Sequence, residues 1–275
     1  MVHAVALPED EFVKECIGIV EKAQNKGIIL RILGALAVYI KSEHCSRCRE
    51  LQKSLGRLEG GATFTDLDLM AYRKQSKDIK KFFEKDLGFI PDRYVNTMFG
   101  GRRLIYYHPD NYYHIDIFFN KLEFSHDIYF GEKPGKGRLE LDYPTITPTD
   151  IVLEKLQIHD INRKDIIDLI VLFLGHELSD SEGKALINAK YIAQVLADDW
   201  GFWYDATNNL KLVKEFANKF MNEGKLTAEE GKLIIAKVDK LLEYIDREPK
   251  TKKWLKRAKV GTKKPWYRVV EEVER

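Results

Sequence analysis

Hydrophobic and polar positions follow two different periods along the chain, and the period predicts which segments are helices and which are strands. Residues 9 to 25 place apolar side chains at helical spacing among charged ones, which predicts an amphipathic helix that ends near Gly27. The run IILRILG predicts a short buried strand, and the apolar run ALAVYIKSEHC after Gly34 predicts a helix packed on that strand. The expected order is therefore strand, glycine turn and helix.

Two later segments alternate apolar and polar residues with the period of two that strands show. The run TFTDLDLMAY alternates aspartate with leucine and phenylalanine, which places Asp66 and Asp68 on one face. The run RRLIYYHPDNYYHIDIFF predicts two strands joined at residues 109 to 111, with His114 and Asp116 on the same side of the second strand. Between these segments, SKDIKKFFEKDLGF predicts a charged amphipathic helix.

The remainder of the chain has a helical pattern. The run TPTDIVLEKLQIHDINRKDIIDLIVLFLG predicts a capped helix, a break near Asn162 and a second helix, with later breaks at Gly224 and near Pro249. The expected fold class is α+β, a mixed sheet flanked by helices and followed by a helical C-terminal region. We expect residues 1–178 to form the α/β core, including the first helix, and residues 179–275 to form the helical region with a basic tail.

Composition excludes several classes of protein. A hydrophobic fraction of 44% and an aromatic fraction of 11% over 275 residues are typical of a globular chain rather than a disordered one. The net charge of +2 is too small to indicate nucleic-acid binding by itself, so charge has to be judged where it clusters. No apolar run reaches the roughly 18 residues of a membrane span, and the acidic start lacks the pattern of a signal peptide. The three cysteines are an odd number, and a chain of this size does not need disulfides to form a core. We therefore expect a cytoplasmic protein with no membrane contact.

The aspartates and the glycine turn together predict a metal-dependent phosphate site. Two carboxylates at alternate strand positions point the same way, about 6 to 7 Å apart, and can share a hard divalent ion such as magnesium. Asp116, on a neighbouring strand, would complete the cage around that ion. Such sites polarise the attacked phosphorus and assist phosphoryl and nucleotidyl transfer. At the glycine turn, backbone amides and a helix N-terminus favour the negative charge of a triphosphate.

These residues resemble a known family. The segments LGALAVYI, TDLDL and HIDIFF are similar to the glycine turn, Asp-x-Asp strand and third carboxylate of the nucleotidyltransferase superfamily with the DNA polymerase beta type fold. The later segment EKLQIHDINRKDIIDL resembles the Lys and Arg-x-Asp-x-x-Asp stretch of the abortive-infection AbiEii/AbiGii-type toxin nucleotidyltransferases. The resemblance covers roughly residues 28 to 178 and does not include most of the helical tail.

The resemblance implies a role for each matching residue of the strands and the glycine turn. Asp66 and Asp68 would bind Mg²⁺, or Mn²⁺, and Asp116 would be either the third ligand or the base that receives the proton of the acceptor hydroxyl. Gly34 and Ala35 would cradle the phosphates of a nucleoside triphosphate, which is the substrate.

The resemblance also implies that Lys155 pairs with the triphosphate and that Asp168, or alternatively Asp165, orients this lysine. A lysine among apolar residues on a helix also commonly extends its ammonium group to solvent. The chain departs from the family pattern at the glycine turn, where the family usually has Gly-Ser or Gly-Gly and this chain has Ala35 after the glycine. The spacing is also longer, so we expect a loop around residues 43 to 62 over or beside the site.

The C-terminal stretch at residues 250–268 has many basic and no acidic residues, interleaved with Trp254, Trp266 and Tyr267. This pattern suits phosphate contact and base stacking, and predicts contact with RNA such as tRNA. The alternative is a solvated basic helix, which is the common outcome for a charge run.

Three further features are weaker candidates. The HCSRC run at residues 44–48 could suggest zinc, but a structural zinc site needs four ligands and no second pair follows. His114 and His126 could contact substrate or could be ordinary histidines at strand ends. Arg102 and Arg103 point to opposite sides of a strand, so at most one of them can reach a nucleotide.

Three hypotheses about function follow. The first is an enzyme that moves a nucleoside monophosphate from a nucleoside triphosphate to an acceptor hydroxyl, on an RNA 3′ end such as that of tRNA, on a protein or on a small molecule. The second is a catalytically silent module of the same fold that binds nucleotide or nucleic acid, which the alanine in the glycine turn favours. The third is a toxin that works with a separate antitoxin partner.

Overall fold

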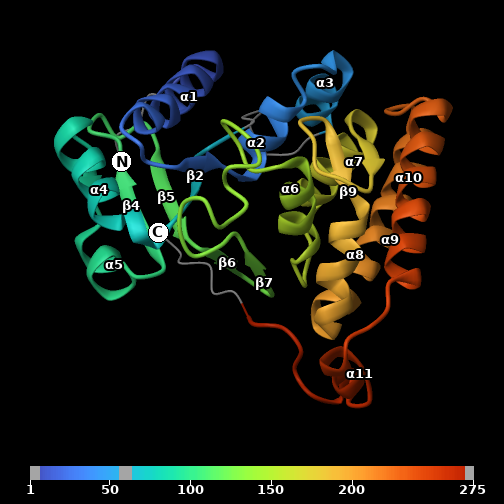
Figure 1. Cartoon of the computed structure of the whole chain (residues 1–275). Coiled ribbons are helices and arrows are strands. Elements are labelled where there is room, and N and C mark those ends of the chain that lie inside the picture. The colour runs from blue at the N-terminus through green and yellow to red at the C-terminus, as the bar shows by residue number, and fades with distance from the viewer. Residues whose placement is uncertain (1–6, 56–63, 270–275) are drawn as a thin grey trace. The chain divides into compact units, whose positions relative to one another are not determined.

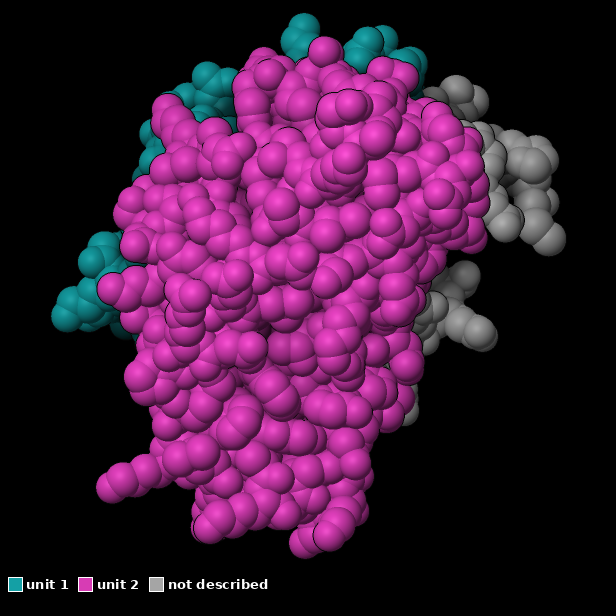
Figure 2. All heavy atoms as spheres, turned by 90° about the vertical axis from the view of Figure 1, so that its right-hand side faces the viewer, with its two compact units in different colours: residues 1–40, 62–122, 129–146 teal, residues 41–61, 123–128, 147–275 magenta. Residues whose placement is uncertain are grey.

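The computed structural model describes residues 7–55 and 64–269 (Figure 1). Within these residues the chain is mixed α+β, as the sequence predicts, with a five-stranded mixed sheet, two small two-stranded sheets and a helical C-terminal region. The chain divides into two compact units, which Figure 2 colours separately. The first comprises Met1–Ile40, Ala62–Leu122 and Tyr129–Ile146, and the second comprises Lys41–Gly61, Glu123–Ile128 and Thr147–Arg275.

This division by compactness differs from the predicted boundary after residue 178. The second unit includes helices α6 (Pro148–Leu156) and α7 (Arg163–Gly175), because both pack against C-terminal helices. The chain also passes from one unit to the other and back at the short strands β6 (Lys121–Glu123) and β7 (Asp127–Tyr129). The boundary after residue 178 was drawn from a resemblance rather than from compactness, and it stays a prediction.

The sheet of the first unit has the strand order β1-β2-β5-β4-β3. Its central strands β2 and β5 run parallel, whereas the other neighbouring pairs are antiparallel. The antiparallel pair β4 and β5 is the predicted hairpin. The strands are β1 (Leu30–Ile32), β2 (Leu67–Ala71), β3 (Ile90–Pro91), β4 (Arg103–Tyr107) and β5 (His114–Phe119).

Helix α1 (Glu9–Asn25) covers the apolar face of this sheet. Its buried residues are those that the helical spacing singles out, and the chain turns at Gly27 with a φ of +74°. The ring of Phe12 meets the ring of Tyr113 edge-on with 5.0 Å between centroids, on the strand face opposite His114. Shorter elements complete the unit: α2 (Gly34–Lys41), a 3-10 turn (Arg73–Gln75), α4 (Ser76–Lys81), a π-helical turn (Phe82–Asp86) and α5 (Arg93–Met98).

The second unit is predominantly helical. The predicted break near Asn162 is an N-cap, because the Asn162 side chain accepts a hydrogen bond from the Asp165 amide at the start of α7. The predicted break at Gly224 is confirmed. This glycine has a φ of +67° and lies just after the helix that ends at Asn222. The other helices of this unit are α3 (Ser46–Ser54), α8 (Ala189–Asp198), α9 (Trp200–Asn222), α10 (Ala228–Arg247), α11 (Lys252–Ala258) and a 3-10 turn (Gly261–Lys263).

Three expectations need correction. The region after residue 178 is not helical throughout, because β8 (Glu177–Ser179) and β9 (Leu186–Asn188) form a short parallel pair. The expected loop at residues 43 to 62 contains α3, and its residues 56 to 62 lie outside the described part of the chain. Cysteines 45 and 48 are joined in a disulfide, although a chain of this size does not need one. Among the described residues, no helix has the length and apolar character needed to cross a bilayer.

Candidate active site

Strand pairing brings two of the three predicted carboxylates together in the first unit. Asp68 on β2 and Asp116 on β5 are register partners on adjacent parallel strands, so their side chains leave the same face of the sheet. Asp66 was expected on the strand with Asp68, but β2 begins at Leu67 and Asp66 lies in the bend just before it.

His114 lies between the carboxylates of Asp66 and Asp116. Its Nε2 lies 3.6 Å from Asp66 Oδ2 and 3.6 Å from Asp116 Oδ2. The Asp66 side chain is 38% exposed, whereas that of Asp116 is only 6% exposed. The cluster therefore runs from a buried carboxylate to one that solvent reaches, with the histidine between them.

Arg103 neutralises the buried member of the cluster. Its Nε donates to Asp116 Oδ1 at 3.0 Å and its Nη2 donates to Asp116 Oδ2 at 2.6 Å, so the contact is bidentate. Burial raises the pKa of Asp116, but hydrogen bonding to His114 and Arg103 and their charges outweigh it, so its pKa lies below the usual range. Of the two neighbouring arginines, Arg103 is the one on the carboxylate face. Asp116 is therefore ionised and already has a cationic partner.

The glycine turn lies beside Asp68, as a phosphate cradle next to the carboxylates requires. The Leu33 amide donates to the Asp68 carbonyl at 3.0 Å, which fixes the turn against β2. Gly34 has a φ of +71°, and a Cβ placed on it would lie 3.0 Å from Asp68 Oδ2. A side chain at this position would thus be strained by its backbone and would crowd the carboxylate. Ala35 follows in the first turn of α2.

The chemistry of this donor set suits a hard divalent ion, since Asp68 and Asp116 share one face of the sheet and His114 connects Asp116 to Asp66 in the bend before β2. Within the described residues, however, no group of three or more acidic, histidine or cysteine side chains is arranged as a metal site. The contact of Arg103 with both oxygens of Asp116 gives a physical reason for this. The residue types fit magnesium, and the predicted third ligand, Asp116, is already in contact with Arg103.

Lys155 and Asp168 lie in the second unit, within a buried ion cluster. Lys155 Nζ lies 2.9 Å from Asp165 Oδ1, 3.1 Å from Asp168 Oδ2 and 3.9 Å from Glu154 Oε1. The Lys155 side chain is 6% exposed and that of Asp168 is fully buried. Both aspartates that the resemblance offers as partners contact the lysine, while a triphosphate role for Lys155 stays a prediction.

The basic tail packs its aromatic rings into the second unit. The ring of Trp254 meets Trp203 edge-on with 5.1 Å between centroids, and the ring of Tyr267 stacks on His159 at 3.5 Å. Trp266 Nε1 donates to Asp205 Oδ1 at 3.0 Å. These rings are half-buried, whereas the tail lysines at positions 252, 253, 256, 259, 263 and 264 are exposed.

The sequence pattern does not indicate Asp205, the carboxylate that contacts Trp266 of this tail. Asp205 Oδ2 lies 2.8 Å from His126 Nε2, and Asp205 Oδ1 lies 2.9 Å from His159 Nδ1. Burial raises the pKa of Asp205, but hydrogen bonds with His126, Trp266 and His159 outweigh it and lower the pKa below its usual range. His126, a substrate candidate from sequence, is thus a buried partner of this network. Asp205 is distant in sequence from its partners, so no local pattern signals it.

The arrangement in the first unit can be compared with known proteins. No protein-family model, curated protein or solved structure matches the chain. The likeness to nucleotidyltransferases therefore rests on the sequence motifs of the glycine turn and the aspartate strands.

Proposed function

We propose that the first unit is a metal-dependent nucleotidyltransferase, which moves a nucleoside monophosphate from a nucleoside triphosphate to an acceptor hydroxyl. The observation that carries the proposal is the register of β2 and β5, which pairs Asp68 with Asp116 next to the glycine turn at Gly34. Carboxylates beside a glycine-led helix supply the two parts that such a site needs, a place for cations and a place for phosphates.

Each residue has a part that follows from its position. Asp66 and Asp68 would bind Mg²⁺ or Mn²⁺, and a bound ion would stabilise the charge on the reacting phosphate. Gly34 lets the backbone at the start of α2 approach the phosphates closely. Asp116, ionised and buried, either completes the ion's ligands or accepts the proton of the acceptor hydroxyl.

For the acceptor, we favour RNA held through the basic tail of the second unit. The exposed lysines at positions 252, 253, 256, 259, 263 and 264 suit contact with phosphates. The aromatic rings of the tail are engaged within the unit, so we expect little base stacking and little sequence preference. A protein or small-molecule acceptor and an antitoxin partner remain predictions from sequence.

The test is incubation of the full chain with Mg²⁺, each α-labelled nucleoside triphosphate, and total RNA or total protein. We expect label in a macromolecular product together with release of pyrophosphate. Changing Asp66, Asp68 or Asp116 to Ala should lower the rate by roughly a hundredfold or more, because each removes several kcal/mol of charge stabilisation. Asp78→Ala is the matched control, an exposed aspartate on α4 outside the cluster.

A catalytically silent binding module is the second candidate, and one observation favours it. Arg103 already occupies both oxygens of Asp116, and the glycine turn carries Ala35 rather than a hydroxyl or a second glycine. Such a module would bind triphosphate or RNA without Mg²⁺ and would be indifferent to the Asp66→Ala and Asp68→Ala changes. Titration calorimetry with and without Mg²⁺ separates the two candidates. Binding that needs neither the ion nor the aspartates, with no label transferred, would sink the enzyme proposal.

A further inference from the structure

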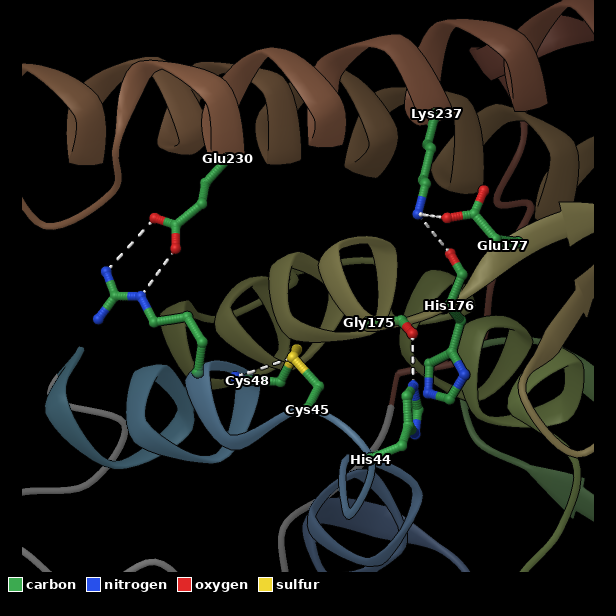
Figure 3. The surroundings of a disulfide bond; sticks show 9 residues. His44, Cys45, Cys48, Gly175, His176, Glu177, Glu230 and Lys237 are labelled. Atoms are coloured by element: carbon green, nitrogen blue, oxygen red, sulfur yellow. Dashed lines mark hydrogen bonds and ion pairs between the residues drawn. A yellow bond between two sulfur atoms is a disulfide. The ribbon is translucent and has the colours of Figure 1, made fainter.

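A pair of cysteines in the second unit lies at the start of helix α3. The sequence Cys-Ser-Arg-Cys places Cys45 at the N-cap and Cys48 in the first turn, with their sulfur atoms joined in a disulfide (Figure 3). Two cysteines with this spacing at a helix N-terminus are typical of pairs that are oxidised and reduced reversibly. The geometry points to a redox-active pair that exchanges two electrons with external thiols and disulfides, independently of the transfer site proposed above.

The two cysteines differ in accessibility. Cys48 is fully buried, whereas Cys45 is half-buried and follows the exposed His44. An external thiol or disulfide therefore meets Cys45 first. Cys48 lies behind it and is placed to react only with Cys45. This asymmetry gives Cys45 the role of the attacking sulfur and Cys48 that of the resolving sulfur.

The helix N-terminus favours negative charge on Cys45. The Cys48 amide donates to Cys45 Sγ at 3.1 Å, so the first turn of α3 directs an N–H group at this sulfur. The first turn contains no acidic residue. Arg47 lies within it, with its guanidinium on Glu230 and Glu50. Because the thiolate is the reactive form, a sulfur in this position is suited to attack a disulfide.

Packing against α7 provides the space for the pair. A Cβ on Gly175, the last residue of α7, would lie 3.0 Å from Cys48 Sγ, so glycine leaves room for the buried sulfur. His44 Nε2 lies 2.6 Å from the Gly175 carbonyl oxygen, which fixes the residue before Cys45 against the same helix (Figure 3). The pair is thus presented by two packed helices rather than by a free loop.

A purely structural role explains this bond poorly. The entropy that a disulfide removes from the unfolded chain grows with the length of the loop it closes. Here the sequence separation is only 3, so the crosslink constrains little of the unfolded chain. The second unit also has an extensive apolar core of its own. Reversible exchange, rather than stabilisation, is what this spacing favours.

The exchange balances with thiols as the co-reactant. In reduction, an external thiolate attacks Cys45 Sγ, the Cys45–Cys48 bond breaks, and Cys48 leaves as a thiolate that takes up a proton. A second external thiol attacks the external sulfur of the mixed disulfide, which releases the Cys45 thiolate and an external disulfide. The protein gains two electrons and, once the Cys45 thiolate is protonated, two protons, while two external thiols become one disulfide. The reverse sequence reduces an external disulfide.

The experiment uses the folded full chain in glutathione buffers of varied thiol-to-disulfide ratio, with alkylation and peptide mass spectrometry. Cleavage after Glu43 and Glu50 by a glutamate-specific protease gives one peptide with both cysteines, and its fragmentation spectrum reads Cys45 and Cys48 separately. We expect both to become alkylatable together, reversibly, along a two-electron curve. Cys16, fully buried in α1, is the internal control and should stay unlabelled while the protein is folded. A disulfide that opens only in denaturant, or thiols that stay reduced in excess glutathione disulfide, would overturn the proposal.

Variants then assign the two roles. Cys48→Ser should accumulate a glutathione adduct on Cys45, roughly tenfold more than Cys45→Ser accumulates on Cys48, because reactivity follows accessibility. Equal adducts, or more on Cys48, would contradict the assigned order of attack. Circular dichroism shows whether each variant is folded, and if the buried Cys48→Ser change unfolds the protein, the wild-type titration decides alone.

Discussion

Each of the two units contains a cation paired with a carboxylate inside a cluster of acidic side chains, and the two clusters differ in how far they are buried. In the first unit, Arg103 is 32% exposed and pairs with Asp116, one of three aspartates. In the second, Lys155 is 6% exposed and is surrounded by Asp165, Asp168 and Glu154. Both clusters have more carboxylates than cations, but only the first remains partly in contact with solvent. The ion site proposed above needs such access, whereas in the second cluster the buried lysine serves as the internal counter-ion.

Residue types alone therefore do not make a cluster of charges a binding site. Buried ion pairs need every partner, because removing one leaves an uncompensated charge in a poorly solvated place. Partly exposed pairs lose little when broken, since water replaces the missing partner. Mutation of the cluster in the second unit should therefore change stability, whereas mutation of the cluster in the first unit should change ion binding.

The largest effect is expected from Lys155→Met in the second unit. The change leaves Asp165 and Asp168 buried without their cation, and we expect a loss of about 3 to 5 kcal/mol in the free energy of unfolding. All four tryptophans of the chain lie between residues 200 and 266, so tryptophan fluorescence during urea unfolding reports on this unit. Adding Asp168→Asn should recover part of the loss, because it removes one unpaired charge.

The matched control for this lysine is Lys232→Met, an exposed position on α10. It should change stability by no more than about 0.5 kcal/mol. If Lys155→Met costs no more than the control, the cluster is not the internal counter-ion system described here, and Lys155 would be available to a ligand.

A smaller effect is expected from pH, through His176 in the interior of the second unit. Burial lowers the pKa of His176 to about 4, so this side chain stays neutral when the unfolded chain takes up a proton below its ordinary pKa of about 6.5. Stability should therefore fall as pH falls, by about 2 kcal/mol between pH 6.5 and 5. His176→Phe removes this contribution. The urea-unfolding difference between wild type and variant should shrink or reverse in favour of the variant between pH 7 and 5.

Between pH 8 and 7 the histidine is neutral in both states, so the same difference should stay constant there. A difference that is constant from pH 8 to 5 would show that His176 is protonated in the folded protein as readily as in the unfolded one.

Much of the fold could be predicted from the sequence because its signals are local. The spacing of Phe12, Cys16 and Ile19 sets the buried face of α1. The alternation around Asp116 sets the faces of β5. Both patterns depend only on neighbouring residues and on the helix and strand periods.

The candidate site could be predicted only in part, because its partners are set by register. Alternation puts Arg102 and Arg103 on opposite faces, but which of them meets Asp116 depends on the length of the hairpin turn, where Asn111 has a φ of +58°. Asp205 contacts two histidines that lie 46 and 79 positions earlier in the sequence, and no local pattern indicates such contacts. The start of β2 after Asp66 likewise depends on pairing with β5 rather than on alternation.

The smallest change in stability, and the most informative one for function, is expected from Arg103→Met. Because Arg103 is partly exposed and His114 Nε2 also lies 3.6 Å from Asp116 Oδ2, we expect the loss of the arginine to lower the free energy of unfolding by about 1 kcal/mol. Removing a positive charge beside Asp116 should at the same time tighten Mg²⁺ binding. A unit charge at about 4 Å contributes between about 1 and 4 kcal/mol depending on the surroundings, which corresponds to roughly fivefold to several hundredfold in affinity. Titration calorimetry with Mg²⁺ measures this change.

The neighbouring Arg102→Met is the matched control, because it removes the same charge from an exposed position in the turn just before β4. Its effect on Mg²⁺ affinity should be small, since screening by water and salt weakens an exposed charge. Equal tightening in both variants would mean that the whole surface charge, and not the contact with Asp116, governs the ion. Tightening in Arg103→Met alone means that this arginine competes with the ion for Asp116. In that case the site of the first unit needs Arg103 to move away from Asp116 before an ion can use that carboxylate, whereas the lysine of the second unit must stay where it is.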